Sequence, residues 1–228
     1  ETQIFNMYAL LRGYHIVSGN TALAIHGMRS EDAEKGSTLS DGSATGKMFD
    51  DFEYAASNGM VKSYWNANYT LIHKANDVLE EMKSNPSLTG GDLVNKGEAL
   101  LMRAFCYFNL ARIWGNVPLV EKPTLSLADV EKPTQSPQSQ VLDLVGKDLE
   151  EAVKLVDEGQ NDVFRFNPGA LYALYTDYAM WMRDYDKAIL YSGKLMDLKR
   201  YSLLKGTEFA QVCADGTTSE NIWTMKWS

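Results

Sequence analysis

The sequence has few cysteines and histidines, and this excludes several kinds of site. Two cysteines in 228 residues cannot build a disulfide scaffold or a four-cysteine zinc site. We expect Cys106 and Cys213 to be small apolar thiols, although one bridge between them stays open. The three histidines, His15, His26 and His73, are too far apart for a metalloprotease motif, and none has an adjacent glutamate. The sequence predicts no metal or other cofactor.

Positive charge and long apolar runs are also scarce. The formal charge is −8 and the pI is about 4.9. Duplex nucleic acid is bound through Lys and Arg on its phosphates, so this balance argues against nucleic acid and against charge-driven binding to anionic membranes. No apolar run approaches the roughly 18 residues of a membrane span. The chain opens without Met or a basic leader, so either a leader has been removed or the chain has been trimmed.

Apolar and aromatic residues are plentiful, at 45% and 11% of the chain. This composition excludes a disordered chain and supplies a core for one domain spanning 1–228. Apolar residues three or four apart predict helices through most of the sequence. We expect helices at 4–17, from 61 for about 22 residues, at 92–114, at 141–156, at 168–182 and at 185–199, and a strand or short helix near 201–204, 209 and 222–223.

Two segments break the periodicity. Residues 18–59 are rich in Gly, Ser, Thr, Asp and Asn, as in a functional loop system. Residues 116–137 hold four of the six prolines and predict an extended connector. We expect Asp92 to cap the helix before the connector and Gly115 to end it.

The helices are separated by short turns, which predicts antiparallel pairs. Ala170, Leu174, Tyr178 and Ala188 follow a tetratricopeptide-like pattern, in which small residues let two helices approach. The predicted fold class is therefore mainly all-α, with tetratricopeptide-like helix pairs and long irregular loops. We expect the outward residues of the 168–199 pair to be charged and to offer no aromatic platform.

Catalytic signatures are almost absent. There is no nucleophile elbow, dinucleotide fingerprint or phosphate-binding loop. Asp50, Asp51 and Glu53 could act as paired carboxylates of a glycosidase, but adjacent loop acids are usually solvated. Asn68 begins a glycosylation sequon in the middle of a predicted helix, which we interpret as chance. We expect the protein not to be an enzyme.

The loop before the second predicted helix mixes aromatic, amide and charged side chains. Aromatic faces bind the C–H-rich side of sugar rings, while amides and charges bind the hydroxyls. Trp65 also lies on the helix stripe, so it can equally belong to the core. The candidate ligand-binding residues are Arg29, Asp32, Phe52, Tyr54, Asn58 and Trp65.

Two segments resemble one family. Residues 64–76 resemble the W-x3-Y-x2-I-x3-N helix of SusD-like (SusD/RagB) nutrient-binding proteins. Residues 97–110 and 114–119 resemble its E-A-x3-R-A, Y-F-x-L and G-x-V-P-L signature, in the same order. Glu98 and Arg103 are five residues apart, so we expect each to hold a neighbouring helix or the connector rather than the other. We expect Asn76 to form a hydrogen bond with backbone across a helix pair. We expect residues 61–114 to form two packed antiparallel helices in which Trp65, Tyr69, Phe105 and Phe108 are mostly buried.

The resemblance implies a surface lipoprotein of the outer membrane of Bacteroidetes-type bacteria. Such proteins bind oligosaccharides or other nutrients and cap a SusC-like TonB-dependent transporter, without enzymatic activity. Family members are longer, and their lipid-bearing N-terminal cysteine is not in this chain, so we expect a fragment or a shortened homologue. The 168–199 pair would then serve stability and transporter docking. The alternative is a tetratricopeptide-like interaction scaffold that binds no sugar.

Overall fold

The computed structural model of the chain describes residues 2–13, 25, 57–85, 87–124, 133–213 and 217–225. Within these ranges the protein is mainly helical, which confirms the predicted fold class. The elements are α1 (Thr2–Arg12), α4 (Gly59–Ser84), α5 (Gly90–Trp114), β1 (Val117–Pro118), β2 (Gln135–Ser136), α6 (Gln138–Leu155), α7 (Pro168–Met182), α8 (Tyr185–Asp197) and a 3₁₀ helix (Gly206–Cys213). None of the described helices is both long enough and apolar enough to span a bilayer.

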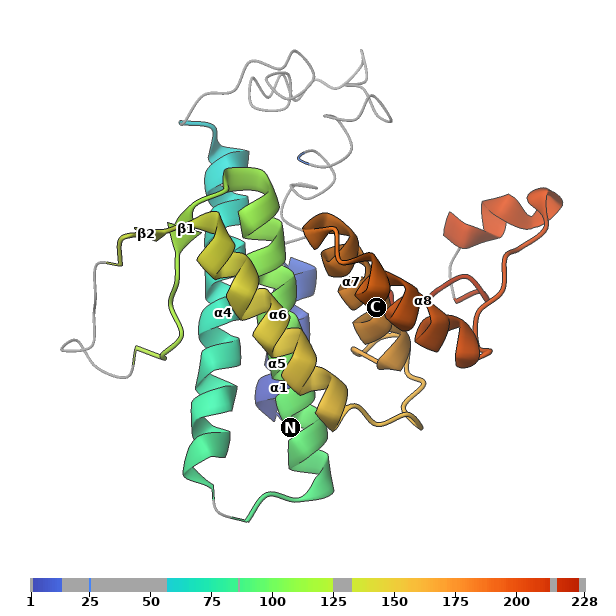
Figure 1. Cartoon of the computed structure of the whole chain (residues 1–228), viewed down its shortest axis with the longest axis horizontal. Helices are drawn as coiled ribbons and strands as arrows, with labels where there is room; N and C mark the ends of the chain where they lie inside the picture. Colours follow the sequence, from blue (N-terminus) through green and yellow to red (C-terminus); the bar gives the residue numbers. More distant parts are fainter. Residues whose placement is uncertain are drawn as a thin grey trace.

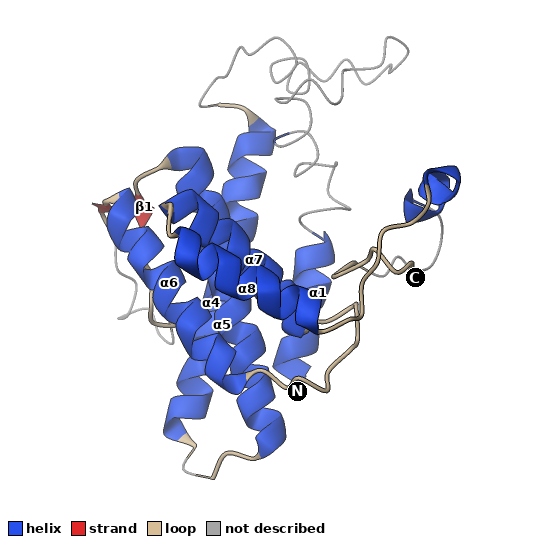
Figure 2. Cartoon of the chain, turned by 45° about the vertical axis from the view of Figure 1, so that its right-hand side comes forward, coloured by secondary structure: helices blue, strands red, loops and turns tan. Residues whose placement is uncertain are grey.

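Helices α4, α5 and α6 form a layer with α5 at its centre (Figure 1). Helix α1 packs mainly on α4, and the α7–α8 pair crosses in front of this layer in Figure 2. Neighbours surround α5, so its residues from Glu98 to Ala111 are buried except Phe105, and most of them are apolar. A helix that is apolar all round belongs at the middle of a bundle. The core therefore lies around α5.

The helix ends follow local sequence signals. Asn58 caps α4, Asn167 precedes Pro168 at the start of α7, and Asp184 caps α8. The predicted cap of α5 was wrong. Thr89 is the N-cap, and Asp92 is the third helical residue of a capping box in which each side chain binds the other's backbone N–H.

The connector turns at Gly115, whose φ of 72° is in the region that favours glycine. Beyond it, β1 and β2 pair antiparallel, with Val117 opposite Ser136. Tyr69 donates its hydroxyl proton to the carbonyl oxygen of Pro118 at 2.7 Å, and the Tyr107 hydroxyl accepts the backbone N–H of Val120 at 2.7 Å. The start of the connector is thus held against the α4–α5 pair.

The prediction that four aromatic residues in 61–114 are mostly buried is confirmed. The two helices pack antiparallel and Phe108 is buried. Trp65, Tyr69 and Phe105 keep a smaller part of their surface exposed and pack at the border of the core. The hydroxyl of Tyr69 reaches the connector backbone, so its ring stands at the edge of the helix pair rather than inside it.

Helix α7 has the predicted bounds and α8 ends at Asp197 rather than at the predicted 199, but the outward face of the pair is not what the sequence predicted. Arg183, Asp184 and Lys187 do lie at or near the surface. They share it with large apolar residues that are at least two-fifths exposed. These are Met180, Trp181, Met182, Tyr185, Ile189, Leu190 and Met196. Helical periodicity finds an apolar face but does not reveal whether that face has a neighbour.

Candidate functional site

Aromatic rings gather where α4 begins and α5 ends. The Trp65 ring lies 5.0 Å from the Tyr69 ring and 5.2 Å from the Trp114 ring, which it meets edge-on. Trp114 also stacks with the buried Tyr64 at 6.2 Å. Two turns of α4 and the last turn of α5 therefore supply one continuous aromatic group. We call Tyr64, Trp65, Tyr69 and Trp114 the aromatic cluster.

The aromatic cluster has the composition of a sugar-binding surface. Trp65 and Trp114 are each partly exposed. Asn66 and Asn116 are exposed and lie close in sequence to Trp65 and Trp114, and the Asn116 side-chain oxygen accepts the backbone N–H of Gln138 at 2.9 Å. Flat apolar rings beside amide groups suit a pyranose, which has an apolar face and hydroxyls around its rim.

Two of the sequence-predicted ligand residues lie within the described part of the chain, and the structure brings them to the same end of α4. Asn58 is buried, and its side-chain oxygen accepts the backbone N–H of Met60 at 2.9 Å. It thus fixes the start of α4 one to two turns before Trp65. Arg29, Asp32, Phe52 and Tyr54 lie outside the described residues.

A buried ion pair ties the three-helix layer together beneath the connector. Arg103 of α5 donates from Nε and one terminal nitrogen to both carboxylate oxygens of Asp148 on α6, each at 2.7 Å. Its other terminal nitrogen donates to Asn76 of α4 at 2.9 Å. Asn76 in turn donates to the carbonyl oxygen of Val120 at 2.7 Å. The Asn76 prediction was therefore correct about a backbone bond, but the backbone belongs to the connector.

A second buried network joins α1 and α5 to the segment just before α7. Arg165 donates to Glu98 at 2.6 Å, and Tyr8 donates to the same carboxylate at 2.5 Å. The Tyr8 hydroxyl also accepts the backbone N–H of Phe166 at 2.7 Å. Burial raises the pKa of the Glu98 carboxyl, while Tyr8 and Arg165 oppose the rise. As predicted, Glu98 and Arg103 bind different neighbours, and both anchor the fold.

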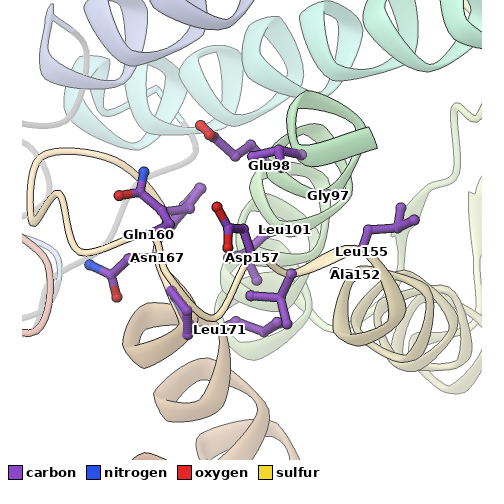
Figure 3. A pocket seen from close by; sticks show the side chains of 13 residues that line it. Gly97, Glu98, Leu101, Ala152, Leu155, Asp157, Gln160, Asn167 and Leu171 are labelled. Carbon is purple, nitrogen blue, oxygen red and sulfur yellow. The ribbon is translucent and has the colours of Figure 1, made fainter. Parts of the chain in front are cut away.

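The cavity below α5 is too small for a sugar. Gly97, Glu98 and Leu101 line it together with Asp157 and Asn167, as Figure 3 shows. Its volume of about 20 Å³ holds about one water molecule. A larger hollow of about 250 Å³ between α1 and the end of α4 has Thr2, Glu81 and Asn85 in its lining but no aromatic ring. The first space is therefore too small for a sugar, and the second has no aromatic ring on which a sugar could stack.

The Cys106 thiol and the sequon at Asn68 are both enclosed. Cys106 is a free, fully buried thiol, and burial raises its pKa, so it packs as a small apolar residue. Asn68 is 0% exposed and donates to the carbonyl oxygen of Tyr64 at 2.8 Å, so its sequon is inaccessible in the fold. No group of three or more His, Cys, Asp or Glu in the described ranges could hold a metal ion.

Comparison with known proteins assigns the family. The family profile described as "Starch-binding associating with outer membrane", SusD-like, matches residues 3–177. The chain belongs to the SusD-like family. SusD-like protein P38 of Formosa agariphila is 34% identical over 139 residues, which are 61% of this chain and 27% of that protein. The family is one of carbohydrate-binding, non-catalytic proteins associated with the outer membrane.

Solved SusD-like structures share the fold. A laminarin-binding SusD-like protein aligns with 97% of this chain at a TM-score of 0.83 and 24% identity. A structure described as being with xylogluco-oligosaccharide aligns with 90% at 0.74 and 21% identity. At these identities the likeness is one of fold. The chain spans about half the length of these structures, 49% of the first and 42% of the second.

Sequence reasoning placed Trp65 near a candidate site but missed Trp114. Trp114 ends α5 and was interpreted only as part of the family signature. The available signal was its position just before Gly115, because a residue at the end of a long helix adjoins a turn rather than another helix. The pairing of Trp114 with Trp65 depends on the antiparallel register of α4 and α5, which the sequence does not state.

Proposed function

We propose that this chain binds oligosaccharides at the aromatic cluster, as the helical portion of a non-catalytic nutrient-binding lipoprotein of the outer-membrane surface. The observation that carries the proposal is the match to a starch-binding, outer-membrane-associated family over residues 3–177. The names of two fold relatives, one laminarin-binding and one described with xylogluco-oligosaccharide, agree with a glycan ligand.

The proposed site combines Trp65 and Trp114 with Arg29, Asp32, Phe52 and Tyr54. Trp65 supplies an apolar face, and the loop residues supply charges, a hydroxyl and further rings. Asn58 acts by holding the first turn of α4 in place rather than by direct contact, since its side-chain oxygen already caps the helix. With half a family-length chain, we expect weak binding, with a Kd near millimolar or roughly −4 kcal/mol.

The partner we propose is a SusC-like TonB-dependent transporter, to which the bound oligosaccharide passes. The membrane is reached through an N-terminal lipid anchor that these 228 residues do not contain. Reading the gene upstream tests the anchor: a lipobox cysteine after a signal peptide supports it, and its absence there contradicts it.

Indole signals give a direct test of the glycan site. The five tryptophans of a ¹⁵N-labelled chain give separate N–H signals, assigned by Trp→Phe variants. On titration with laminari-oligosaccharides and xylogluco-oligosaccharides, we expect the Trp65 and Trp114 signals to shift. Trp181 is the matched control, because it is 47% exposed on the α7–α8 pair. Shifts at Trp181 that spare Trp65 would show that the two surfaces are reversed.

Variants then test the loop residues. We expect Phe52→Ala and Tyr54→Ala each to weaken binding at least tenfold while the circular dichroism spectrum stays unchanged. Unchanged affinity in both would remove the loop from the site. No binding to any glycan, with a transporter complex retained, would favour the alternative of a tetratricopeptide-like scaffold.

A further inference from the structure

Helix α8 carries an exposed apolar stripe. Tyr185, Ile189 and Met196 are four and seven residues apart, which places them on one side of the helix. Ile189 is 71% exposed and Met196 is 76% exposed, while Ala188 and Tyr191 on the other side are buried. A contiguous apolar surface of this kind marks an interaction site in a folded protein.

A glycine in the middle of the stripe indicates what shape the partner has. Gly193 lies four residues after Ile189, inside α8, and a Cβ built on it meets nothing within 4 Å. Glycine inside a helix lowers helix stability relative to alanine, and nothing nearby in the described structure requires it here. Small residues on a helix surface let the backbone of a second helix approach closely. The stripe therefore has a bulky–small–bulky outline that fits another helix.

The charges beside the stripe indicate the sign of the partner. Asp186 and Asp197 are exposed on the flank of the stripe. The lysines of α8 point elsewhere: Lys187 pairs with Glu150 at 2.9 Å, and Lys194 lies over the Tyr172 ring. An antiparallel second copy would bring Asp186 of one chain near Asp197 of the other, which is unfavourable. Lys or Arg on the partner would instead pair with both.

We propose that Tyr185, Ile189, Gly193 and Met196 dock an amphipathic helix whose apolar stripe is flanked by Lys or Arg. In SusD-like chains of family length, this helix comes from the part that has no counterpart in these 228 residues. The solved relatives are about twice as long, so they have residues to supply it. In arrays of helix pairs each unit buries its face against the next, and α8 is the outermost helix of the described pairs. The proposal does not depend on glycan binding.

Peptide binding tests whether the partner is an amphipathic helix with basic flanks. The probe is a synthetic 18-residue helix with a Leu stripe, Ala at its centre and Lys on both flanks, and its control has Glu in place of Lys. By calorimetry with the 228-residue chain, we expect the Lys peptide to bind at least tenfold more tightly. Ile189→Asp and Met196→Asp should each weaken it at least tenfold. Leu203→Asp, 90% exposed outside α8, should leave it unchanged.

The variant Gly193→Leu distinguishes docking of a helix from nonspecific hydrophobic binding. The added side chain has open space in the chain alone, so the fold should persist by circular dichroism. It would block close approach of a helix, and we expect at least a tenfold loss of Lys-peptide binding. Equal or tighter binding by this variant, or equal binding of both peptides, would overturn the proposal. So would a dimer in light scattering that Ile189→Asp dissolves, because the occupant would then be a second copy.

The source of the helix is tested with 20-residue peptides tiled along SusD-like protein P38. We expect binding by at least one peptide from outside the segment that matches this chain, and loss of that binding with Ile189→Asp. Binding confined to peptides of the matched segment, or binding by none, would overturn the assigned source. Unaltered indole shifts with oligosaccharides in the same Ile189→Asp variant keep this outcome distinct from a failure of the glycan proposal.

Discussion

Helices α5 and α8 are both rich in large apolar residues, but their surroundings differ completely. In α5, Met102 and Phe108 are 0% exposed because α4 and α6 lie on either side. In α8, Ile189 and Met196 are mostly exposed, because among the described elements α7 is its principal neighbour. The same residue types therefore hold the fold together in one helix and present a free face in the other. Substitutions in the two helices should separate these roles.

The largest expected effect is at the centre of α5. Phe108 is fully buried and contacts the Tyr178 and Trp181 rings edge-on. Phe108→Ala removes these contacts and leaves a cavity, so the free energy of unfolding should fall by about 3–5 kcal/mol. Urea denaturation measures it, with Ile189→Ala as the matched control in α8, expected within about 0.5 kcal/mol of the parent. A loss below about 1 kcal/mol at Phe108 would reject the α5 register.

The second effect concerns the buried ion pair between α5 and α6. Asp148→Asn keeps the shape but removes the charge that Arg103 faces. We expect a loss of about 1.5–3 kcal/mol, typical of hydrogen bonds to charged groups. Glu150→Gln, on the exposed side of the same helix, is the control. If the two variants were equally stable in urea, the Arg103–Asp148 pair would contribute nothing beyond a surface bridge.

The sequence predicted the helices well and their surroundings poorly. The bounds of α7 and the start of α8 followed from periodicity, which is a local signal. The caps Asn167 and Asp184, which the prediction did not use, are local signals too. The cap of α5 was misassigned because a capping box pairs two residues three apart, and only the structure shows which one stands outside the helix. The exposure of Ile189 depends on what lies beside α8, and no property of α8 alone encodes that.

In the candidate site too, residues with a local sequence signal were predicted, and residues that depend on helix pairing were not. Trp65 was found because its chemistry is local: an aromatic ring at the junction of a loop and a helix. Trp114 joined it only through the pairing of α4 with α5, 49 residues apart along the chain. Asn58 was proposed for its amide chemistry, but the same oxygen is the best local cap for α4. Arg29, Asp32, Phe52 and Tyr54 lie outside the described residues and stay predictions.

A smaller effect with the opposite sign is expected inside the α8 stripe. Gly193→Ala should raise the free energy of unfolding by about 0.5–1 kcal/mol, because alanine favours the helix and its methyl group meets nothing within 4 Å. Gly146→Ala of α6 is the contrasting variant, since a Cβ there would lie 2.6 Å from the Tyr178 hydroxyl oxygen. Thermal unfolding should show a rise for the first and a fall for the second. A fall for both would mean that α8 is covered in the isolated chain.

The smallest effect lies in the ion pair that ties α8 to α6, a neighbour of α5: Lys187 of α8 lies 2.9 Å from Glu150 of α6. The hydrogen bond from Lys187 lowers the pKa of the Glu150 carboxyl. A carboxyl with a lowered pKa stabilises the fold above its unfolded pKa, near 4.3, and this contribution disappears as the pH falls through the folded value. Because both side chains are about half exposed, the bridge is worth only about 0.5 kcal/mol. The stability difference between the parent and Glu150→Gln should therefore be present at pH 7 and vanish near pH 3. A difference that grew in acid would mean that burial, rather than Lys187, controls this carboxyl, and the α6–α8 contact would be far tighter than its exposure indicates.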